Sequence, residues 1–386
     1  MTGTLRIAHL RLVDALPLVA ARELGLAEAE GIAAELVAAS SWSALRDMLA
    51  TRRVEAAQML SPMPIAAALG LGGAVGPVEA LQVLSVNGNG IGVSSALIER
   101  MDSVPFGDAR AAGAALIAAA EASPLRIGVP FPFSMHAELV HYWLEGCGPP
   151  AESAIRIRTV PPPLMQDALE SGEIDAFCVG EPWGSAAVER GAAMLILPGS
   201  AIWSFAPEKV LAARAGWAEA EPALAAGIMR ALHRAARWLS EPRNLSTASE
   251  IGARALSLPA ELIERALSGR LITRQDAPAQ DVPAFLEFHQ GAASFPWRSQ
   301  GAWIADRLAL RHGLDRSRAQ SVGRAVFRSD LYRRFLGELA VDLPGASQKI
   351  EGAIAAPSPV ASRRGTLVLR PDRFFDGRIF EPLPED

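Results

Sequence analysis

The sequence predicts an α/β protein of two similar lobes with a ligand cleft between them. Strand-like and helix-like segments alternate up to residue 86, the same alternation restarts at residue 125, and the chain becomes mainly helical after about residue 200. A chain of 386 residues is long enough for two domains with separate cores. We expect lobe I at 1–90, lobe II at 91–200, a helical return to lobe I at 201–345, and a surface tail at 346–386.

The first copy of the alternation begins at the N-terminus. Residues 4–10 alternate apolar and polar side chains as a strand does, and we expect Asp14 to cap the helix that follows and Gly25 to end it. A turn is expected at 87–90, because the sequence there is Asn-Gly-Asn-Gly. The further expected strands are 33–38, 54–60 and 80–86, and the further expected helices are 42–51 and the segment after Ser61-Pro-Met-Pro64 up to Leu69. Such alternation predicts a mostly parallel sheet.

The second copy of the alternation follows a connection through residues 87–95. Its expected strands are 125–129, 155–160, 176–179 and 193–197, and its expected helices are 135–145 and 164–171. Beyond residue 200, Gly227–Leu239 repeats apolar residues at a spacing of three to four, which suits a helix packed back onto the first lobe. The tail is rich in Pro, Ser and Arg and contains one short strand-like segment at 366–369.

Composition excludes several classes of function. Half of the residues are hydrophobic, but no apolar run reaches the roughly 20 residues that span a bilayer, so we expect no membrane insertion. A net charge of −5 without a basic cluster argues against direct binding of nucleic acid. Two cysteines are too few for a disulfide framework. The chain enters its first strand at once, and Arg6 and Arg11 interrupt any signal-like apolar segment, so we expect a cytoplasmic protein.

Two side chains hold equivalent places in the two copies. Trp42 and His136 each follow a serine in the first turn of a helix that comes after a strand. If the lobes face one another, both side chains point into the cleft beside helix N–H groups, which attract anions. A planar oxyanion such as nitrate or nitrite could accept hydrogen bonds from the Trp42 indole N–H and from His136. The alternative is that Trp42 is a core residue and His136 is a satisfied histidine at the cleft edge.

Lys209 is one of only two lysines among 37 basic residues. A compact ammonium fits against a small ion without the bulk of a guanidinium, so Lys209 is a candidate cation that closes over an anion. The alternative is an ordinary surface lysine that pairs with Glu208.

Polar and stiff segments complete the candidate site. Gln58 and Asn89 lie at strand ends and could donate to an oxyanion, although Gln58 could equally satisfy backbone groups. Pro162 belongs to a run of three prolines that stiffens a strand exit. Glu181 would repel an anion, so we expect it to cap a helix or to bind a basic group.

Patterns typical of catalysis are missing from the sequence. It contains no Gly-x-Ser-x-Gly, no phosphate-binding loop, no His-Glu-x-x-His and no Cys-x-x-Cys. The six histidines are scattered, and His136 and His141 are five residues apart, which places them on different faces of a helix. We therefore expect neither an enzyme, nor a cofactor, nor a metal site.

Several motifs resemble the nitrate- and bicarbonate-binding proteins of the NrtA/CmpA family, over nearly the whole chain. They are Gln58-Met-Leu-Ser-Pro-Met-Pro64, Phe131-Pro-Phe-Ser-Met-His136, Tyr142-Trp-Leu144, Val160-Pro-Pro-Pro163, Phe177-Cys-Val-Gly-Glu-Pro-Trp183, Pro207-Glu-Lys209, Phe295-Pro-Trp-Arg-Ser299 and Pro371-Asp-Arg-Phe-Phe-Asp-Gly377. The resemblance implies the two-lobed periplasmic-binding-protein fold of type II.

The resemblance also implies which residues hold the ligand. In nitrate-binding members a tryptophan, a glutamine, a histidine, a proline-region backbone and a lysine surround the anion. By motif these correspond to Trp42, His136, Pro162 and Lys209, and the glutamine falls near Asn89, whose amide side chain is shorter. Bicarbonate-binding members use acidic residues and calcium, so a histidine and a lysine favour nitrate or nitrite.

The resemblance suggests two roles. A family member without an export signal or a lipid-attachment cysteine resembles the cytoplasmic nitrate/nitrite sensors of the NasS type. These imply a protein partner, a NasT-like RNA-binding antiterminator of the ANTAR class, which controls nitrate-assimilation genes. The alternative is the substrate-binding component of a nitrate, nitrite or bicarbonate ABC transporter. A thiamine-pyrimidine synthase shares the fold, but its cysteine-rich stretch is missing.

Overall fold

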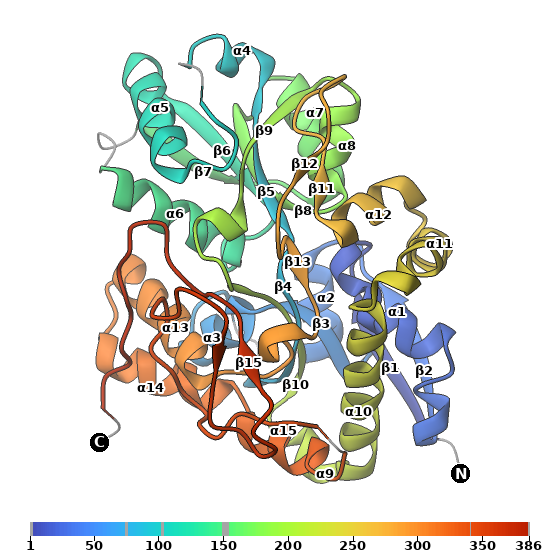
Figure 1. The fold of residues 1–386 in the computed structure, drawn as a ribbon. Helices are drawn as coiled ribbons and strands as arrows, with labels where there is room; N and C mark the ends of the chain where they lie inside the picture. The colour runs from blue at the N-terminus through green and yellow to red at the C-terminus, as the bar shows by residue number, and fades with distance from the viewer. Residues whose placement is uncertain (1–2, 74–75, 102–103, 149–153, 340, 385–386) are drawn as a thin grey trace.

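A computed structural model gives the structure of the chain and describes residues 3–73, 76–101, 104–148, 154–339 and 341–384. Two lobes are each built on one mixed β-sheet with helices on its faces (Figure 1). Within these described ranges, no helix has both the length and the apolar character that a bilayer span requires.

The first lobe contains a six-stranded sheet in the order β13-β4-β10-β3-β1-β2. Its strands are β1 Gly3–His9, β2 Ile32–Ala38, β3 Ala56–Leu60, β4 Val78–Asn87, β10 Pro207–Arg214 and β13 Leu286–Glu287. β1 pairs in parallel with β2 and β3, whereas β10 pairs antiparallel with both β3 and β4. The strands β1 to β4 thus run in one direction, as expected for a mostly parallel sheet, whereas β13 and β10, which returns from the second lobe into the middle of the first sheet, run against them.

The second lobe contains a five-stranded sheet in the order β7-β6-β8-β5-β9. Its strands are β5 Asn89–Ser94, β6 Leu125–Val129, β7 Ile155–Thr159, β8 Ala176–Gly180 and β9 Ala193–Pro198. β5 lies in the middle and is antiparallel to β8 and β9. The expected turn at 87–90 shrinks to Gly88, which alone separates β4 from β5 and has a φ of +89°. A left-handed φ favours glycine here, and a Cβ would also lie 2.7 Å from the Leu286 side chain.

Helices cover both sheets. They are α1 Leu16–Glu23, α2 Trp42–Ala50, α3 Pro62–Ala68, α4 Ser95–Ile98, α5 Ala109–Ala122, α6 Met135–Cys147, α7 Met165–Glu170, α8 Trp183–Glu189, α9 Trp217–Ala220, α10 Pro222–Leu239, α11 Leu245–Leu256, α12 Ala260–Ser268, α13 Arg298–His312, α14 Arg316–Val326 and α15 Ser329–Leu336. The chain was expected to be helical after residue 200. This expectation is wrong for β10, which is a buried strand in the middle of the first sheet.

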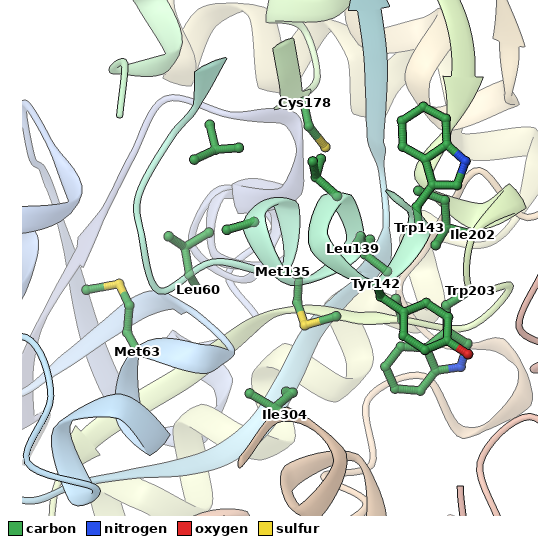
Figure 2. Close-up of a cluster of buried hydrophobic side chains, with 14 of the residues drawn as sticks. Leu60, Met63, Met135, Leu139, Tyr142, Trp143, Cys178, Ile202, Trp203 and Ile304 are labelled. Atoms are coloured by element: carbon green, nitrogen blue, oxygen red, sulfur yellow. The ribbon is translucent and has the colours of Figure 1, made fainter. Parts of the chain in front are cut away.

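The two lobes share one continuous core. Figure 2 shows Leu60 and Met63 of the first lobe near Met135 and Leu139 of α6 in the second, with Ile304 of α13 close by. All of these side chains are at most 5% exposed. Dry contact across the lobe boundary favours a closed arrangement.

The tail is held in place by buried side chains and does not simply lie on the surface. Glu351 and Asp372 are 0% exposed, and Phe374 packs against Trp203 and Trp303 with ring centroids 4.9 and 5.7 Å away. The expected strand is the short β15 Val368–Leu369, which pairs with β14 Ser358–Pro359. These contacts make the last part of the chain a structural element of the fold.

Candidate functional site

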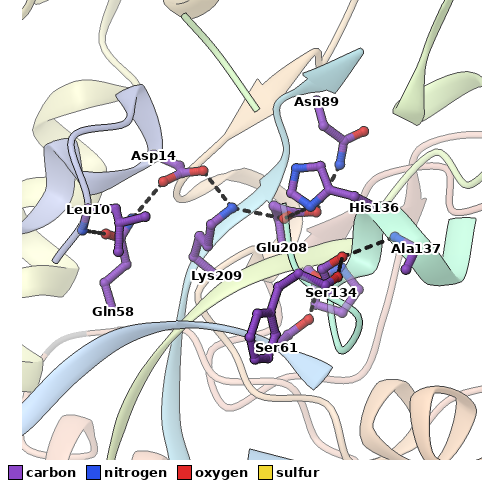
Figure 3. Close-up of polar contacts among 12 residues, drawn as sticks. Leu10, Asp14, Gln58, Ser61, Asn89, Ser134, His136, Ala137, Glu208 and Lys209 are labelled. Carbon is purple, nitrogen blue, oxygen red and sulfur yellow. Dashed lines mark hydrogen bonds and ion pairs between the residues drawn. The ribbon is translucent and has the colours of Figure 1, made fainter. Parts of the chain in front are cut away.

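A network of buried polar side chains lies where the two sheets meet (Figure 3). At its centre the Lys209 ammonium lies 2.7 Å from Asp14 Oδ2 and 2.8 Å from Glu208 Oε1. All three side chains are at most 3% exposed. Lys209 is therefore buried, and the alternative of a surface lysine is wrong. The pairing with Glu208 that this alternative expected is present.

The strand β10 brings both Glu208 and Lys209 into the network. Neighbouring side chains on a regular strand point to opposite faces. The pairing of β10 with β4, however, shifts register between Pro207 and Lys209 and again between Lys209 and Val210. We attribute the joint orientation of these two charged side chains to this local irregularity.

Glu208 connects the lysine to the second lobe. Its Oε2 accepts a hydrogen bond of 2.8 Å from Asn89 Nδ2 at the start of β5. Its Oε1 lies 3.2 Å from His136 Nδ1 in α6, although this contact lacks hydrogen-bond geometry. Asn89 and His136, two of the predicted site residues, thus meet at one carboxylate.

Asp14 connects the lysine to the first lobe. Its Oδ1 accepts a hydrogen bond of 2.6 Å from Gln58 Nε2, and Gln58 Oε1 in turn accepts one of 3.2 Å from the Leu10 backbone N–H. The expectation that Asp14 caps α1 is wrong, because its carboxylate is used by the buried network and α1 has no side-chain cap. The alternative for Gln58, satisfaction of a backbone group, is borne out by the Leu10 contact.

Trp42 lies at the first position of α2, after the capping residue Ser41, whose Oγ accepts a hydrogen bond from the Ala44 N–H. Its ring centroid is 5.5 Å from the Lys209 ammonium, a cation–π distance. Its side chain is 2% exposed and its indole Nε1 has no hydrogen-bond partner. Trp42 therefore offers a buried donor that the protein leaves unused.

His136 repeats this arrangement in the second lobe. Ser134 caps α6 by accepting a hydrogen bond from Ala137 N–H, and His136 is the second residue of that helix. The imidazole is 1% exposed, and its Nε2 also lacks a partner. Burial and the charge of Lys209 lower the pKa of His136 well below 6.5. The ring is neutral at pH 7, so its contact with Glu208 is not an ion pair.

The electrostatics of the network are unbalanced. Burial raises the pKa of both Asp14 and Glu208, while these two carboxylates together raise the pKa of Lys209 despite its burial. With both carboxyl groups ionised and His136 neutral, two negative charges face one positive charge. A further anion can enter only if a proton or a rearrangement offsets its charge.

Pro162 lies apart from this network. It is buried at the start of the short 3-10 turn Pro162–Leu164, and it borders a cavity of about 420 Å³ together with Arg11 and Trp183. The structure shows no contact of Pro162 with Lys209 or His136, so its role in ligand binding stays a prediction.

Glu181 caps α8 as expected, because its Oε2 accepts a hydrogen bond of 3.3 Å from Ser185 N–H.

Sequence reasoning missed two acidic members of the network, Asp14 and Glu208. The available signal was the unusual placement of two adjacent charges in the apolar segment Phe205–Ala213. Burial of such charges requires compensating partners, which points to a network and not to a surface loop. Asp14, in contrast, carried no signal beyond its position before a helix.

Comparisons with known proteins identify the family and the fold of the chain. The family model described as NMT1-like matches residues 2–253. The nitrate import ATP-binding protein NrtC of Synechocystis sp. is 33% identical over 79% of this chain, but the match covers 45% of that protein. The chain thus spans about half the length of the NrtC relatives.

A second relative matches along the full chain. The nitrate/nitrite binding protein NrtA of Nostoc sp. is 27% identical over 100% of this chain and 84% of its own length. The crystal structure of the periplasmic nitrate-binding protein NrtA from Synechocystis superposes with a TM-score of 0.84 at 25% identity and covers 98% of this chain and 95% of that one. These matches confirm the predicted two-lobed, periplasmic-binding-protein-like fold and the resemblance to the NrtA/CmpA proteins.

Proposed function

The chain belongs to the NMT1-like family, and we propose that it is a binding protein, not an enzyme, that holds nitrate or nitrite between its two lobes. The observation that carries this proposal is a pair of buried, unpartnered donors. Trp42 Nε1 comes from one lobe and His136 Nε2 from the other, and both residues lie beside the buried ammonium of Lys209. A planar anion with three or two oxygens can accept from all three groups at once.

The names of the relatives agree with this ligand class. NrtA of Nostoc sp. is named a nitrate/nitrite binding protein, and CmpA of Synechococcus elongatus, 25% identical, is named a bicarbonate-binding protein. Bicarbonate is planar too, so the test has to separate these anions. A neutral His136 with one N–H and a charged Lys209 supply donors without a metal, which favours nitrate or nitrite.

Isothermal titration of the full chain with nitrate, nitrite, bicarbonate and sulfate tests the proposal. We expect saturable heat with nitrate, with nitrite, or with both, and none with sulfate, whose tetrahedral shape and double charge do not suit the network. His136→Leu and Trp42→Phe should each weaken the binding. Absence of heat with both nitrogen oxyanions would contradict the proposal, as would binding that survives unchanged in both variants.

We propose further that the protein is a cytoplasmic sensor whose closure controls a NasT-like RNA-binding antiterminator. The support is the resemblance of the motifs to the NrtA/CmpA proteins, the family to which the resemblance assigns such sensors. A ligand can shift an open–closed equilibrium only through its differential affinity for the two states, and moving it from 1:99 to 99:1 takes about 5.5 kcal/mol. Co-purification of the two proteins with and without nitrate tests the proposal, and we expect nitrate to release the antiterminator. Fractionation of cells that express the full-length gene product tests the location.

A second candidate role is the substrate-binding part of a nitrate or nitrite importer. The observation that favours it is the match of this chain to about half of an import ATP-binding protein. Reconstitution with the permease and ATPase of a nitrate importer separates the two roles. Nitrate uptake that depends on this chain supports transport, whereas nitrate-dependent release of an antiterminator supports sensing.

A further inference from the structure

A cavity with hydrogen-bonded polar groups in its wall lies in the first lobe, outside the cleft and under the C-terminal tail. The cavity has a volume of about 500 Å³ and is bounded by α10, α15 and the turn Gln290–Ala292, with segments 341–344 and 366–368 as its cover. In Figure 1 α10, α15 and β15 lie in the lower half of the molecule, with the first lobe. The volume falls in the range of about 300–1,000 Å³ that is typical of small-molecule sites.

A chain of polar groups forms the floor of this cavity. Ser294 Oγ lies 2.8 Å from Tyr332 Oη, and Tyr332 Oη lies 3.4 Å from His233 Nδ1. The His289 ring packs edge-on against His233, with centroids 4.9 Å apart. Ser294, Tyr332 and His233 are at most 7% exposed. Burying polar groups costs free energy unless they form hydrogen bonds within the protein or with a ligand, and apolar side chains would fill the same volume without that cost.

The two histidines are neutral donors and acceptors. Burial lowers the pKa of His233 to about 3 and also lowers that of His289, with Arg237 adding to both effects. Each neutral ring carries one N–H and one acceptor nitrogen. His289 Nδ1 is buried and has no hydrogen-bond partner, so this floor contains a polar atom that nothing in the described chain satisfies.

The rim of the cavity is positively charged. Arg234 forms an ion pair with Glu30 at 2.6 Å, which uses one of its nitrogen atoms. Arg237 lies on the same helix and has no ion pair within the described residues. The acidic residue of the lining, Asp342, already accepts hydrogen bonds from Ser362 and Thr366, among others. The unused charge at this rim is therefore cationic.

We propose that this cavity is a second binding site, separate from the cleft, for a small aromatic carboxylate. The carboxylate binds the Arg237 guanidinium at the rim, where a fork of N–H donors suits two oxygens. The ring enters the space beside the apolar side chains of Phe295, Leu343 and Leu367. A polar ring substituent reaches the unsatisfied His289 Nδ1.

Titration calorimetry of the full chain with salicylate tests this site, and salicyl alcohol serves as the uncharged probe of the same shape. We expect salicylate to bind and Arg237→Gln to weaken it at least about tenfold, as loss of a charge-assisted hydrogen bond does. Arg237 is exposed, so this variant should fold. Arg243→Gln, whose side chain is 81% exposed outside the cavity lining, is the matched control and should leave the affinity unchanged.

Variants of the cleft separate this site from the anion site. His136→Leu should weaken nitrate but leave salicylate binding unchanged, and Arg237→Gln should do the reverse. No binding of salicylate overturns the second site whether or not nitrate binds. Equal affinity for salicyl alcohol, an unchanged affinity in Arg237→Gln, or loss of salicylate binding in His136→Leu would each overturn it as well.

Discussion

The chain contains two lysines, and the structure places both in nearly the same local surroundings. Lys209 contacts Asp14 and Glu208, and its ammonium lies 5.5 Å from the ring of Trp42. Lys349 contacts two carboxylates as well, those of Glu351 and Asp372, and lies 5.8 Å from the ring of Trp297. In a chain whose other 35 basic residues are arginine, both sites use the compact cation.

The two clusters differ in what surrounds the ion pairs. Around Lys349, Glu351 Oε1 accepts from Ser299 Oγ at 2.6 Å, and Asp372 Oδ1 accepts from Ile354 N–H at 2.8 Å. The first bond holds the tail onto α13, and the second joins two segments of the tail to each other. Around Lys209, the nitrogen atoms of Trp42 and His136 and one oxygen of Asn89 have no hydrogen-bond partner, whereas around Lys349 the indole Nε1 of Trp297 has none. The difference teaches that several unpartnered polar groups from both lobes, and neither the buried ion pair nor a single unpartnered N–H, distinguish a binding site from a structural anchor.

The largest expected effect is loss of ligand binding in Lys209→Met. The variant removes the cation that faces the anion and leaves Asp14 and Glu208 to repel it, so nitrate affinity should fall at least about 100-fold, the size of a lost buried charge contact. Calorimetry measures the affinity, and circular dichroism checks that the variant is folded. Binding within about threefold of the parent in a folded Lys209→Met would remove the distinction between the two lysines.

Lys349→Met should reduce stability without reducing affinity. Breaking a buried pair while its acidic partners remain costs about 3–5 kcal/mol, because Glu351 and Asp372 are left without their cation. Urea unfolding gives the free energy of unfolding, and nitrate titration at low urea gives the affinity of the folded protein. A drop in nitrate affinity as large as that of Lys209→Met would show that the tail cluster belongs to the ligand site.

The two tryptophans provide a matched pair of smaller changes. Trp42→Phe keeps a ring beside Lys209 but removes the indole donor, so nitrate affinity should fall about tenfold, equivalent to one hydrogen bond to a charged acceptor. Trp297→Phe makes the same change beside Lys349 and should leave affinity unchanged. Equal affinities in the two variants would mean that the Trp42 N–H does not face the ligand.

The smallest expected effect is a dependence of affinity on pH. Burial raises the pKa of Asp14 above 3.8 and that of Glu208 above 4.5, so the folded protein retains protons that the unfolded chain has lost. Their contribution to stability is therefore complete below about pH 4 and is lost as the pH rises through the folded-state pKa values. A bound anion raises these pKa values further, so nitrate should bind more tightly as the pH falls, by at most about tenfold per pH unit.

Proton uptake during binding measures this coupling directly. Calorimetry in buffers of different ionisation enthalpy should give uptake in the parent protein and less uptake in Asp14→Asn. Glu351→Gln alters an equivalent carboxylate in the other cluster and should not change the uptake. Nitrate binding without any proton uptake at pH 6–7 would show that the network rearranges instead of taking up a proton.

Local sequence pattern was sufficient for the elements whose neighbours are close in the chain. The strands near residues 4, 33, 125 and 176 and the capped helix starts at Trp42 and Met135 agree with the structure to within a few residues. Their apolar periodicity and capping serines are local signals. The family resemblance added which of these ends face one another.

The elements that the sequence did not reveal depend on distant contacts. β10 becomes a strand because β3 and β4, more than a hundred residues earlier, accept it between them. The sequence does not predict β5, because the Asn and Gly at its start indicate a turn at 87–90. Asp14 leaves its expected capping position because Lys209, far along the chain, offers it a charge. Pairing across such separations has no signature in a local window.

Gly88 has a mechanical consequence. Only one residue separates β4 from β5, so the chain passes from one sheet to the other at this point with almost no linker. A rotation of one lobe against the other changes the backbone torsions at Gly88 and also where the chain returns from β9 to β10, and we expect the lobes to rotate about an axis near Gly88 and not to slide. That axis lies one residue from Asn89, which contacts Glu208. Atoms close to a rotation axis move little, so a rotation that moves the outer edges of the lobes far displaces the side chains of the site only slightly.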